Sequence, residues 1–175
     1  MTELLASIRT ALVGSQISQL AEYLLRKIPG FPPITQTVHI LGVSAVMGSV
    51  VLLNLNVLGL GLRSYRTSDL TRRLLPWTWS ALPFLALSGL LFVFARPNRY
   101  LRNPVFGIKF ALLAPALALT ALYHVPTLKD PDYWDRSTGR RVAARALAAV
   151  SLLLWLAVVM AGRWIAYAEY LFPPD

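Results

Sequence analysis

The side chains best suited to chemistry in this sequence are its two histidines, His39 and His124. His39 lies in an apolar run, because no Asp, Glu, Lys or Arg occurs between Phe31 and Leu62. A neutral imidazole can coordinate haem iron or another metal, and it can also form hydrogen bonds between helices. Ionisable groups in such surroundings mark functional sites by default, so we expect His39 to have a ligand or a polar partner.

Two cationic residues, Lys109 and Arg163, are expected at the same depth as His39. Lys109 lies about five residues from one end of an apolar segment, and Arg163 lies near the corresponding end of another. Exposing such a group to lipid costs about 2.5 to 3.5 kcal/mol. Because Glu169 is the only carboxylate nearby, a bound anionic group would satisfy these cations. Alternatively, Lys109 snorkels to the lipid headgroups and Arg163 anchors in an aromatic belt.

A haem bound through His39 would need its sixth ligand from elsewhere. His124, expected to be an interfacial histidine, lies about 20 Å deeper at a rise of about 1.5 Å per residue, so both histidines cannot clamp one haem. The candidates are Met160, water or a symmetry-related chain, although methionine in an apolar helix usually serves packing. The alternative for His39 is a hydrogen bond to Gln36, Thr35 or a backbone carbonyl.

The composition places these residues in an integral membrane protein. The chain has 175 residues, of which 56% are hydrophobic, and its mean hydropathy is +0.55. A helix needs about 20 apolar residues to cross a hydrocarbon core of about 30 Å. Four segments reach this length, at about residues 34–60, 74–95, 104–125 and 142–167. We therefore predict an all-α fold, an integral membrane four-helix bundle that forms one domain over residues 29–175.

The net charge of +9 does not indicate a nucleic-acid partner. The basic residues lie in short loops between the spans, where membrane lipids with anionic headgroups are the nearer partner. The chain has no cysteine, which excludes disulfides, thiolate metal sites and cysteine nucleophiles. No Walker loop, dinucleotide fingerprint or Gly-x-Ser-x-Gly elbow occurs, so the sequence supports no hydrolase chemistry and leaves enzymatic activity open.

Residues 1–28 are predicted to form an N-terminal interfacial amphipathic helix. Apolar residues recur at helical spacing, while Arg9, Gln16, Gln19 and Arg26 lie elsewhere around the helical wheel. The segment KIPGFPP then ends this helix and leads into the first span. Because residues 1–28 lack a basic region followed by an unbroken apolar stretch, we expect them to be retained and not cleaved as a signal peptide.

The basic residues also predict the orientation in the membrane. Nine lie in or beside the loops after the first and third spans, and six lie on the opposite side. Under the positive-inside rule, both termini then face away from the cytoplasm, and the cluster around His39 lies near the outer face. The aromatic belt on that side is predicted to comprise Trp164, Tyr167, Tyr170 and Phe172.

Three blocks, PITQTVHILGVSAVMGSVVL, NPVFGIKFALL and SLLLWLAVVMAGRWIAY, resemble a bacterial four-span inner-membrane family catalogued as domain of unknown function 6644. The resemblance covers about residues 32–167 and implies a bacterial inner membrane. In such a membrane, the orientation predicted from the basic residues places both termini in the periplasm. It also implies a histidine in the first block, a lysine after the Asn-Pro pair and a Gly-Arg pair in the last span. These correspond to His39, Lys109 and Gly162-Arg163. The family carries no established activity.

Two positions depart from the pattern of that family. The acidic residue often found three positions before the histidine is Gln36 here, and an Asp-Leu-Arg that often ends the first span is replaced by Asn54-Leu55-Asn56. Both changes remove charge. No carboxylate on the same helix face is therefore present to orient or charge His39.

Two functional hypotheses use the cluster around His39. In the first, the protein is an inner-membrane b-type haem-binding protein that transfers electrons, and its bundle is similar to membrane cytochrome b architectures. In the second, it is a non-redox membrane subunit that binds an anionic lipid, a quinone or a small anion. We favour the first because it uses the otherwise unmatched histidine. The candidate cofactor-binding residues are His39, Lys109, Arg163, Gln36 and Met160, with His39 as the metal ligand.

Association with a second copy is also expected. Small residues along the first span, Gly42, Ala45 and Ser49, permit close contact between helices. A twofold partner could supply the missing haem ligand, so we expect a homodimer. If the protein transfers electrons, we also expect it to bind a redox partner or a quinone. Pro83 and Pro115 are expected to kink the second and third spans at mid-membrane and to open space in the bundle.

Overall fold

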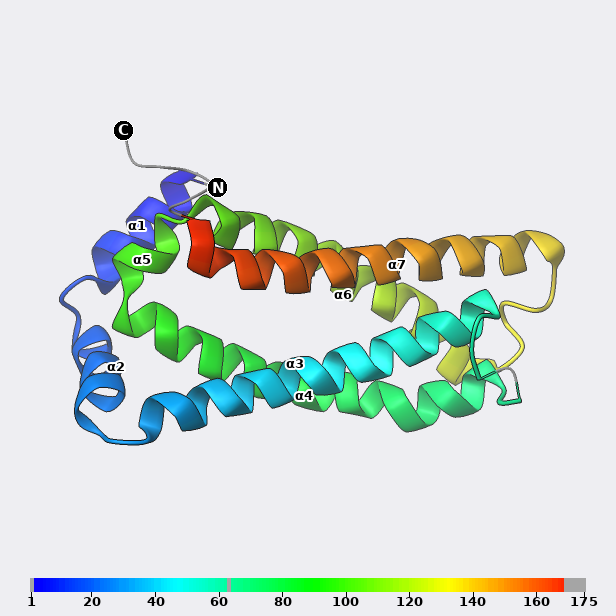
Figure 1. Ribbon diagram of the computed structural model, residues 1–175. Coiled ribbons are helices and arrows are strands. Elements are labelled where there is room, and N and C mark those ends of the chain that lie inside the picture. Colours follow the sequence, from blue (N-terminus) through cyan, green and yellow to red (C-terminus); the bar gives the residue numbers. More distant parts are fainter. Residues whose placement is uncertain (1, 63, 169–175) are drawn as a thin grey trace.

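The structure is a computed structural model that describes residues 2–62 and 64–168 (Figure 1). Within this part of the chain every regular element is a helix, which confirms the predicted all-α class. The elements are α1 (Thr2–Leu12), α2 (Gln16–Lys27), α3 (Phe31–Leu58), α4 (Thr67–Ala95), α5 (Pro97–Leu101), α6 (Pro104–Lys129), α7 (Thr138–Trp164) and the 3-10 turn η1 (Ile165–Tyr167). Glu169, Tyr170 and Phe172 lie outside the described residues.

Four of these helices, α3, α4, α6 and α7, are long and apolar enough to cross a membrane. Their most apolar windows have mean hydropathies between 1.8 and 2.2. The α3 helix has 28 residues. It is therefore about 42 Å long at about 1.5 Å per residue, which exceeds a hydrocarbon core of about 30 Å. The prediction of a four-span, multi-pass membrane protein is confirmed.

All four spanning helices extend at one end beyond the apolar segments that predict them, as α4 and α6 illustrate. The α4 helix begins at Thr67, before the segment 74–95, and α6 continues through Pro126 to Lys129 instead of ending at 125. Pro126 lacks an N–H group, yet the next residue, Thr127, is 2% exposed and its hydroxyl donates to the Tyr123 carbonyl at 3.0 Å. Packing of this turn against its neighbours outweighs the local cost of the proline.

The predicted N-terminal segment is helical, but it forms the two helices α1 and α2 with a break between them. Gly14 adopts a φ of +78°, and the Ser15 hydroxyl caps α2 by accepting the Ser18 N–H at 3.2 Å. The α2 helix docks on the end of α4, where the Ser18 hydroxyl donates to the Phe94 carbonyl at 2.8 Å. Ala21 is 2% exposed in this contact region. The segment is therefore attached to the bundle.

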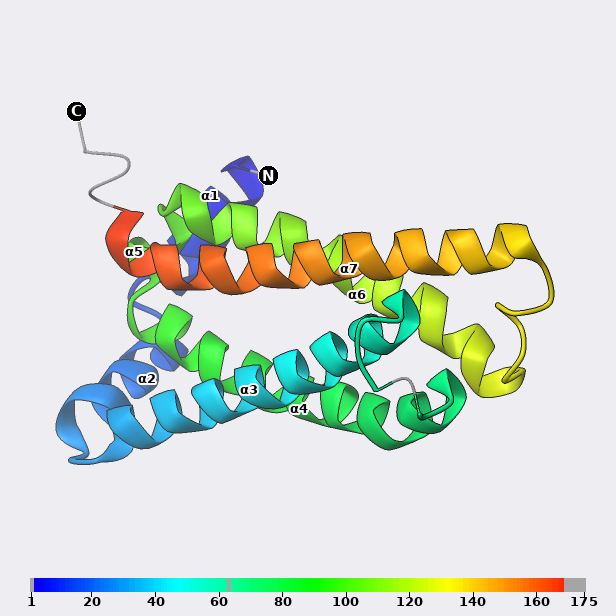
Figure 2. The same cartoon turned by 45° about the vertical axis from the view of Figure 1, so that its right-hand side comes forward.

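The spans are arranged as two packed pairs, α3 with α4 and α6 with α7 (Figures 1 and 2). Gly42 allows close approach within the first pair, since a Cβ there would lie 2.9 Å from the Leu85 side chain. The two pairs share a core that includes Val46, Ala116 and Trp155. Toward the end of the bundle that carries α1, α2 and α5, the ribbons of the two pairs diverge in both views.

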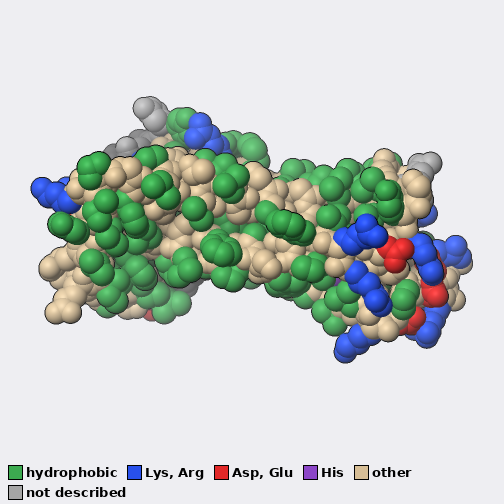
Figure 3. All heavy atoms as spheres, turned by 90° about the horizontal axis from the view of Figure 1, so that it is seen from below, with side chains coloured by type: hydrophobic (Ala, Val, Ile, Leu, Met, Phe, Trp, Pro, Cys, Tyr) green, Lys and Arg blue, Asp and Glu red, His purple; other side chains and the backbone are tan. Residues whose placement is uncertain are grey.

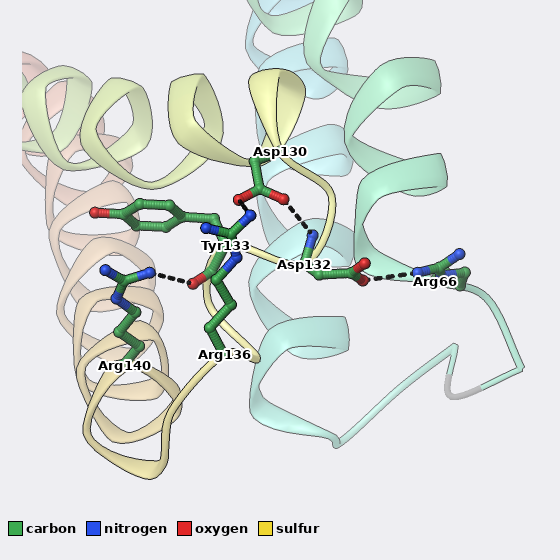
Figure 4. Close-up of polar contacts among 6 residues, drawn as sticks. All are labelled: Arg66, Asp130, Asp132, Tyr133, Arg136 and Arg140. Carbon is green, nitrogen blue, oxygen red and sulfur yellow. Dashed lines mark hydrogen bonds and ion pairs between the residues drawn. The ribbon is translucent and has the colours of Figure 1, made fainter.

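Charged side chains gather at the opposite end, around the α3–α4 and α6–α7 loops, while hydrophobic side chains cover the middle of the molecule (Figure 3). Ion pairs in this region join Arg66 to Asp132 at 2.8 Å and Arg136 to Asp130 at 2.7 Å (Figure 4). An apolar band with a polar end is the surface expected of a protein whose middle faces lipid.

Candidate functional site

His39 on α3 is held by a hydrogen bond to Ser88 on the neighbouring helix α4. The distance from His39 Nδ1 to Ser88 Oγ is 2.8 Å. The histidine is half-buried and Ser88 is 6% exposed. The residue after the serine is Gly89, and a Cβ there would already touch His39 Cε1 at 3.5 Å. Two small residues of α4 therefore provide the space and the polar partner for the ring.

The position of the Ser88 hydroxyl favours one tautomer of the neutral His39 ring. This hydroxyl donates to the Phe84 carbonyl one turn earlier. A hydroxyl has a single proton to donate, so while it is given to this carbonyl Ser88 Oγ can only accept from His39. In that tautomer Nδ1 is protonated and Nε2 of the neutral ring keeps a lone pair. A hydrogen-bonded Nδ1–H together with a basic Nε2 is the arrangement of a histidine that coordinates a metal.

Lys109 on α6 is half-buried in the apolar part of the bundle. The lysine side chain passes close to Gly162 on α7, where an added Cβ would lie 3.8 Å from both Cε and Nζ of Lys109. Within the described residues, Lys109 Nζ has no hydrogen bond and no ion pair. A partly buried ammonium without a counter-charge favours an anionic group at this position.

His39 Nε2 and Lys109 Nζ are both accessible from outside the chain. Across residues 2–62 and 64–168, the one buried side-chain nitrogen or oxygen without a hydrogen bond is Asn54 Nδ2. His39 Nε2 and Lys109 Nζ have no hydrogen-bond partner among the described residues either. Because Asn54 Nδ2 is the one unpaired atom that is fully buried, these two atoms are at least partly exposed.

The other three residues predicted for the site lie at the surface of the bundle. Gln36 is exposed on α3, and Met160 on α7 is 52% exposed. Arg163 is exposed as well, and its guanidinium donates to the Tyr167 hydroxyl at 3.1 Å and lies 5.2 Å from the centre of that ring. The structure thus places His39 against Ser88 and Lys109 against Gly162, and it leaves Gln36, Met160 and Arg163 at the surface.

His124 occupies a separate environment near the loop end of the bundle. It is 3% exposed, so the bundle buries it, and it lies near the end of α6 as expected from the sequence. Its Nδ1 lies 3.2 Å from the Thr71 hydroxyl on α4, and its ring packs edge-on against Tyr123 at a centroid distance of 4.8 Å. The burial follows from the continuation of α6 past Pro126, which keeps this turn packed against α4.

Ser88 and Gly89 are site residues that the apolar pattern of the sequence does not reveal. The sequence indicates them only weakly, because a small or polar residue in a membrane helix predicts a contact with another helix but not which residue it contacts. Their role depends on the register between α3 and α4, which also pairs Ser49 with Thr78 at 2.9 Å.

Comparison with known proteins identifies a family but no activity. The family model described as "Family of unknown function (DUF6644)" matches residues 21–168, which include the whole cluster around His39. No curated protein and no solved structure matches the chain significantly. Because the family match covers most of the chain, the protein belongs to the family of unknown function DUF6644.

Proposed function

We propose that this protein binds b-type haem in a bacterial inner membrane, with His39 as an axial ligand, and that it transfers electrons. The observation that carries the proposal is the hydrogen bond of 2.8 Å between His39 Nδ1 and Ser88 Oγ, which leaves Nε2 without a partner among the described residues. Ligating histidines commonly donate their second ring N–H to a fixed acceptor, which orients the ring and raises its basicity. Haem would supply the redox chemistry, and the bundle would hold and orient it.

Lys109 supports the same ligand. Haem carries propionate groups, which are anions and need cations when they enter a membrane. Lys109 offers a half-buried ammonium group that has no counter-charge within the described residues. Arg163 follows Gly162 on α7, but its guanidinium engages Tyr167 and would have to leave that contact to reach a propionate.

The donor set suits haem better than a bare metal ion. A bare ion usually takes three or more protein ligands, and no group of three or more His, Cys, Asp or Glu side chains occurs in the described ranges. The porphyrin nitrogens fill most positions around haem iron, so one histidine with water or a second chain suffices. Met160 is 52% exposed, so it would serve as a ligand only toward a neighbouring copy, as in the expected homodimer.

A second candidate function is a non-redox subunit that binds a quinone, an anionic lipid or a small anion. The observation that favours it is the ammonium group of Lys109, which has no ion pair among the described residues and fits any anionic or carbonyl oxygen. In this reading, His39 Nε2 accepts a hydrogen bond from a ligand hydroxyl, such as that of a quinol.

The proposed orientation places this cluster near the periplasmic face. It rests on the nine basic residues in or beside the loops after the first and third spans, against six on the other side. Reporter fusions at Asp135 and after the C-terminus test it. We expect a cytoplasmic signal at Asp135 and a periplasmic signal at the terminus, and the reverse result would move His39 to the cytoplasmic side.

The experiment for the haem proposal is a visible spectrum of the protein expressed with ample haem supply and purified in detergent, before and after dithionite. We expect a reduced haem b band in the wild type and in His124→Ala, because His124 is bonded to Thr71 at a different depth. The band should be absent in His39→Ala. A colourless wild type would refute haem binding and favour the second candidate.

A further inference from the structure

A second polar site lies at the end of the bundle opposite to His39, between the α3–α4 and α6–α7 loops. A cavity of about 350 Å³ has walls that include Ser64, Arg66, Thr67, Ser68, Asp132 and Asp135. The ion pair between Arg66 and Asp132, at 2.8 Å, joins the two loops across it (Figure 4). Since the four spans begin or end around these loops, the cavity lies at the level of the lipid headgroups.

One wall of the cavity is the N-terminus of α4. Its N-cap residue, Arg66, makes no side-chain cap, and its carbonyl accepts only from the N–H groups of Asp69 and Leu70, so those of Thr67 and Ser68 are left for another acceptor. The helix dipole favours an anion there. Ser68 gives an independent indication, because it is 5% exposed, lines the cavity and has a hydroxyl without a hydrogen-bond partner in the described part of the chain.

The opposite wall is acidic. Asp132 forms an ion pair with Arg66, whereas Asp135 makes no ion pair with any described residue. Two carboxylates beside the same cavity would repel a plain anion such as free phosphate. They would attract an ammonium group that can donate hydrogen bonds to them.

The other charged side chains of this loop already have partners. Asp130 pairs with Arg136 at 2.7 Å. Arg140 lies 4.5 Å from the centre of the Tyr133 ring and donates to the Tyr133 carbonyl (Figure 4). Asp135 is therefore the carboxylate of this loop that remains for a ligand.

We propose that this cavity binds a phosphoethanolamine group, with the phosphate at the N-terminus of α4 and the primary ammonium between Asp132 and Asp135. An anion-binding wall that faces a cation-binding wall fits a zwitterion with both charges a few bonds apart. Phosphocholine fits less well, because its methylated nitrogen has no N–H to donate. The group belongs either to a membrane phospholipid or to a soluble phosphodiester, and the inference does not depend on haem binding at His39.

The test uses the full chain in detergent and native mass spectrometry with equal amounts of dioleoyl phosphatidylethanolamine, phosphatidylcholine and phosphatidylglycerol. We expect preferential retention of phosphatidylethanolamine by roughly tenfold, the scale of one charge-assisted hydrogen bond. Ser68→Ala and Asp135→Asn should each reduce that retention by a similar factor. Glu22→Gln is the control, because Glu22 on α2 is a partly exposed carboxylate at the opposite end of the bundle and does not line the cavity.

A parallel calorimetric titration with glycerophosphoethanolamine distinguishes the two sources of the group. Binding of this soluble compound would identify a soluble phosphodiester as ligand, and retention of the lipid alone would identify a phospholipid. Equal retention of the three lipids, without binding of the soluble compound, would overturn the proposal. Unchanged retention in both Ser68→Ala and Asp135→Asn would overturn it as well.

Discussion

Replacing Ser88 with alanine tests whether the hydrogen bond to His39 orients a ligand. The change removes the acceptor that lies 2.8 Å from His39 Nδ1 and leaves the ring N–H without a partner in a half-buried position. Loss of such a supporting contact typically lowers metal affinity by about 10- to 100-fold, which corresponds to about 1.4 to 2.8 kcal/mol. Ser88→Ala should therefore release haem at correspondingly higher concentrations of a competing haem acceptor, such as apomyoglobin.

The matched variants separate this role from general packing. Ser88→Thr keeps a hydroxyl and should retain haem better than Ser88→Ala. Ser44→Ala is the control, because the Ser44 hydroxyl bonds only to the Ile40 carbonyl of its own helix and the residue is exposed. Haem release from Ser88→Ala at the wild-type rate would refute the reasoning, since the orienting hydrogen bond would then contribute nothing to the ligand.

Three further substitutions have defined outcomes. Lys109→Met should weaken haem retention but keep the reduced haem b spectrum, because it removes a counter-charge and no iron ligand; loss of the spectrum would contradict this. Asn54→Leu should raise the thermal midpoint in detergent, since it removes a buried amide whose Nδ2 has no hydrogen bond; a lower midpoint would point to an unseen partner. Gly42→Val should lower the midpoint because its Cβ would meet Leu85 at 2.9 Å, whereas Gly48→Val, with open space, should not.

The number and order of the spans can be predicted from the sequence because they depend only on the length and hydrophobicity of each segment. Apolar stretches of the length of α3, α4, α6 and α7 have one environment in which they are stable. The helix ends are harder to predict, since the turns beyond the apolar core are polar. The first turn of α4 at Thr67 and the turn of α6 beyond Pro126 are fixed by packing and hydrogen bonds, which hydropathy does not report.

The candidate site is predicted only in part, for a reason that is specific to membrane helices. His39 and Lys109 stand out because ionisable groups are rare in apolar runs. The spans are apolar on all sides, so their sequences do not show which face points inward. The rotation of α7 about its axis is set by packing, and it places Met160 and Arg163 at the surface and Gly162 against Lys109. The partnership of His39 with Ser88 likewise requires the register of α3 and α4.

The most direct test of the account is a titration of purified, haem-free protein with haemin, followed by the absorbance of the Soret band. The account predicts saturable binding with a spectrum of histidine-ligated haem for the wild type and for His124→Ala, and no such spectrum for His39→Ala. The same spectrum and affinity in His39→Ala as in the wild type would contradict the central claim that the free Nε2 of His39 is the ligand.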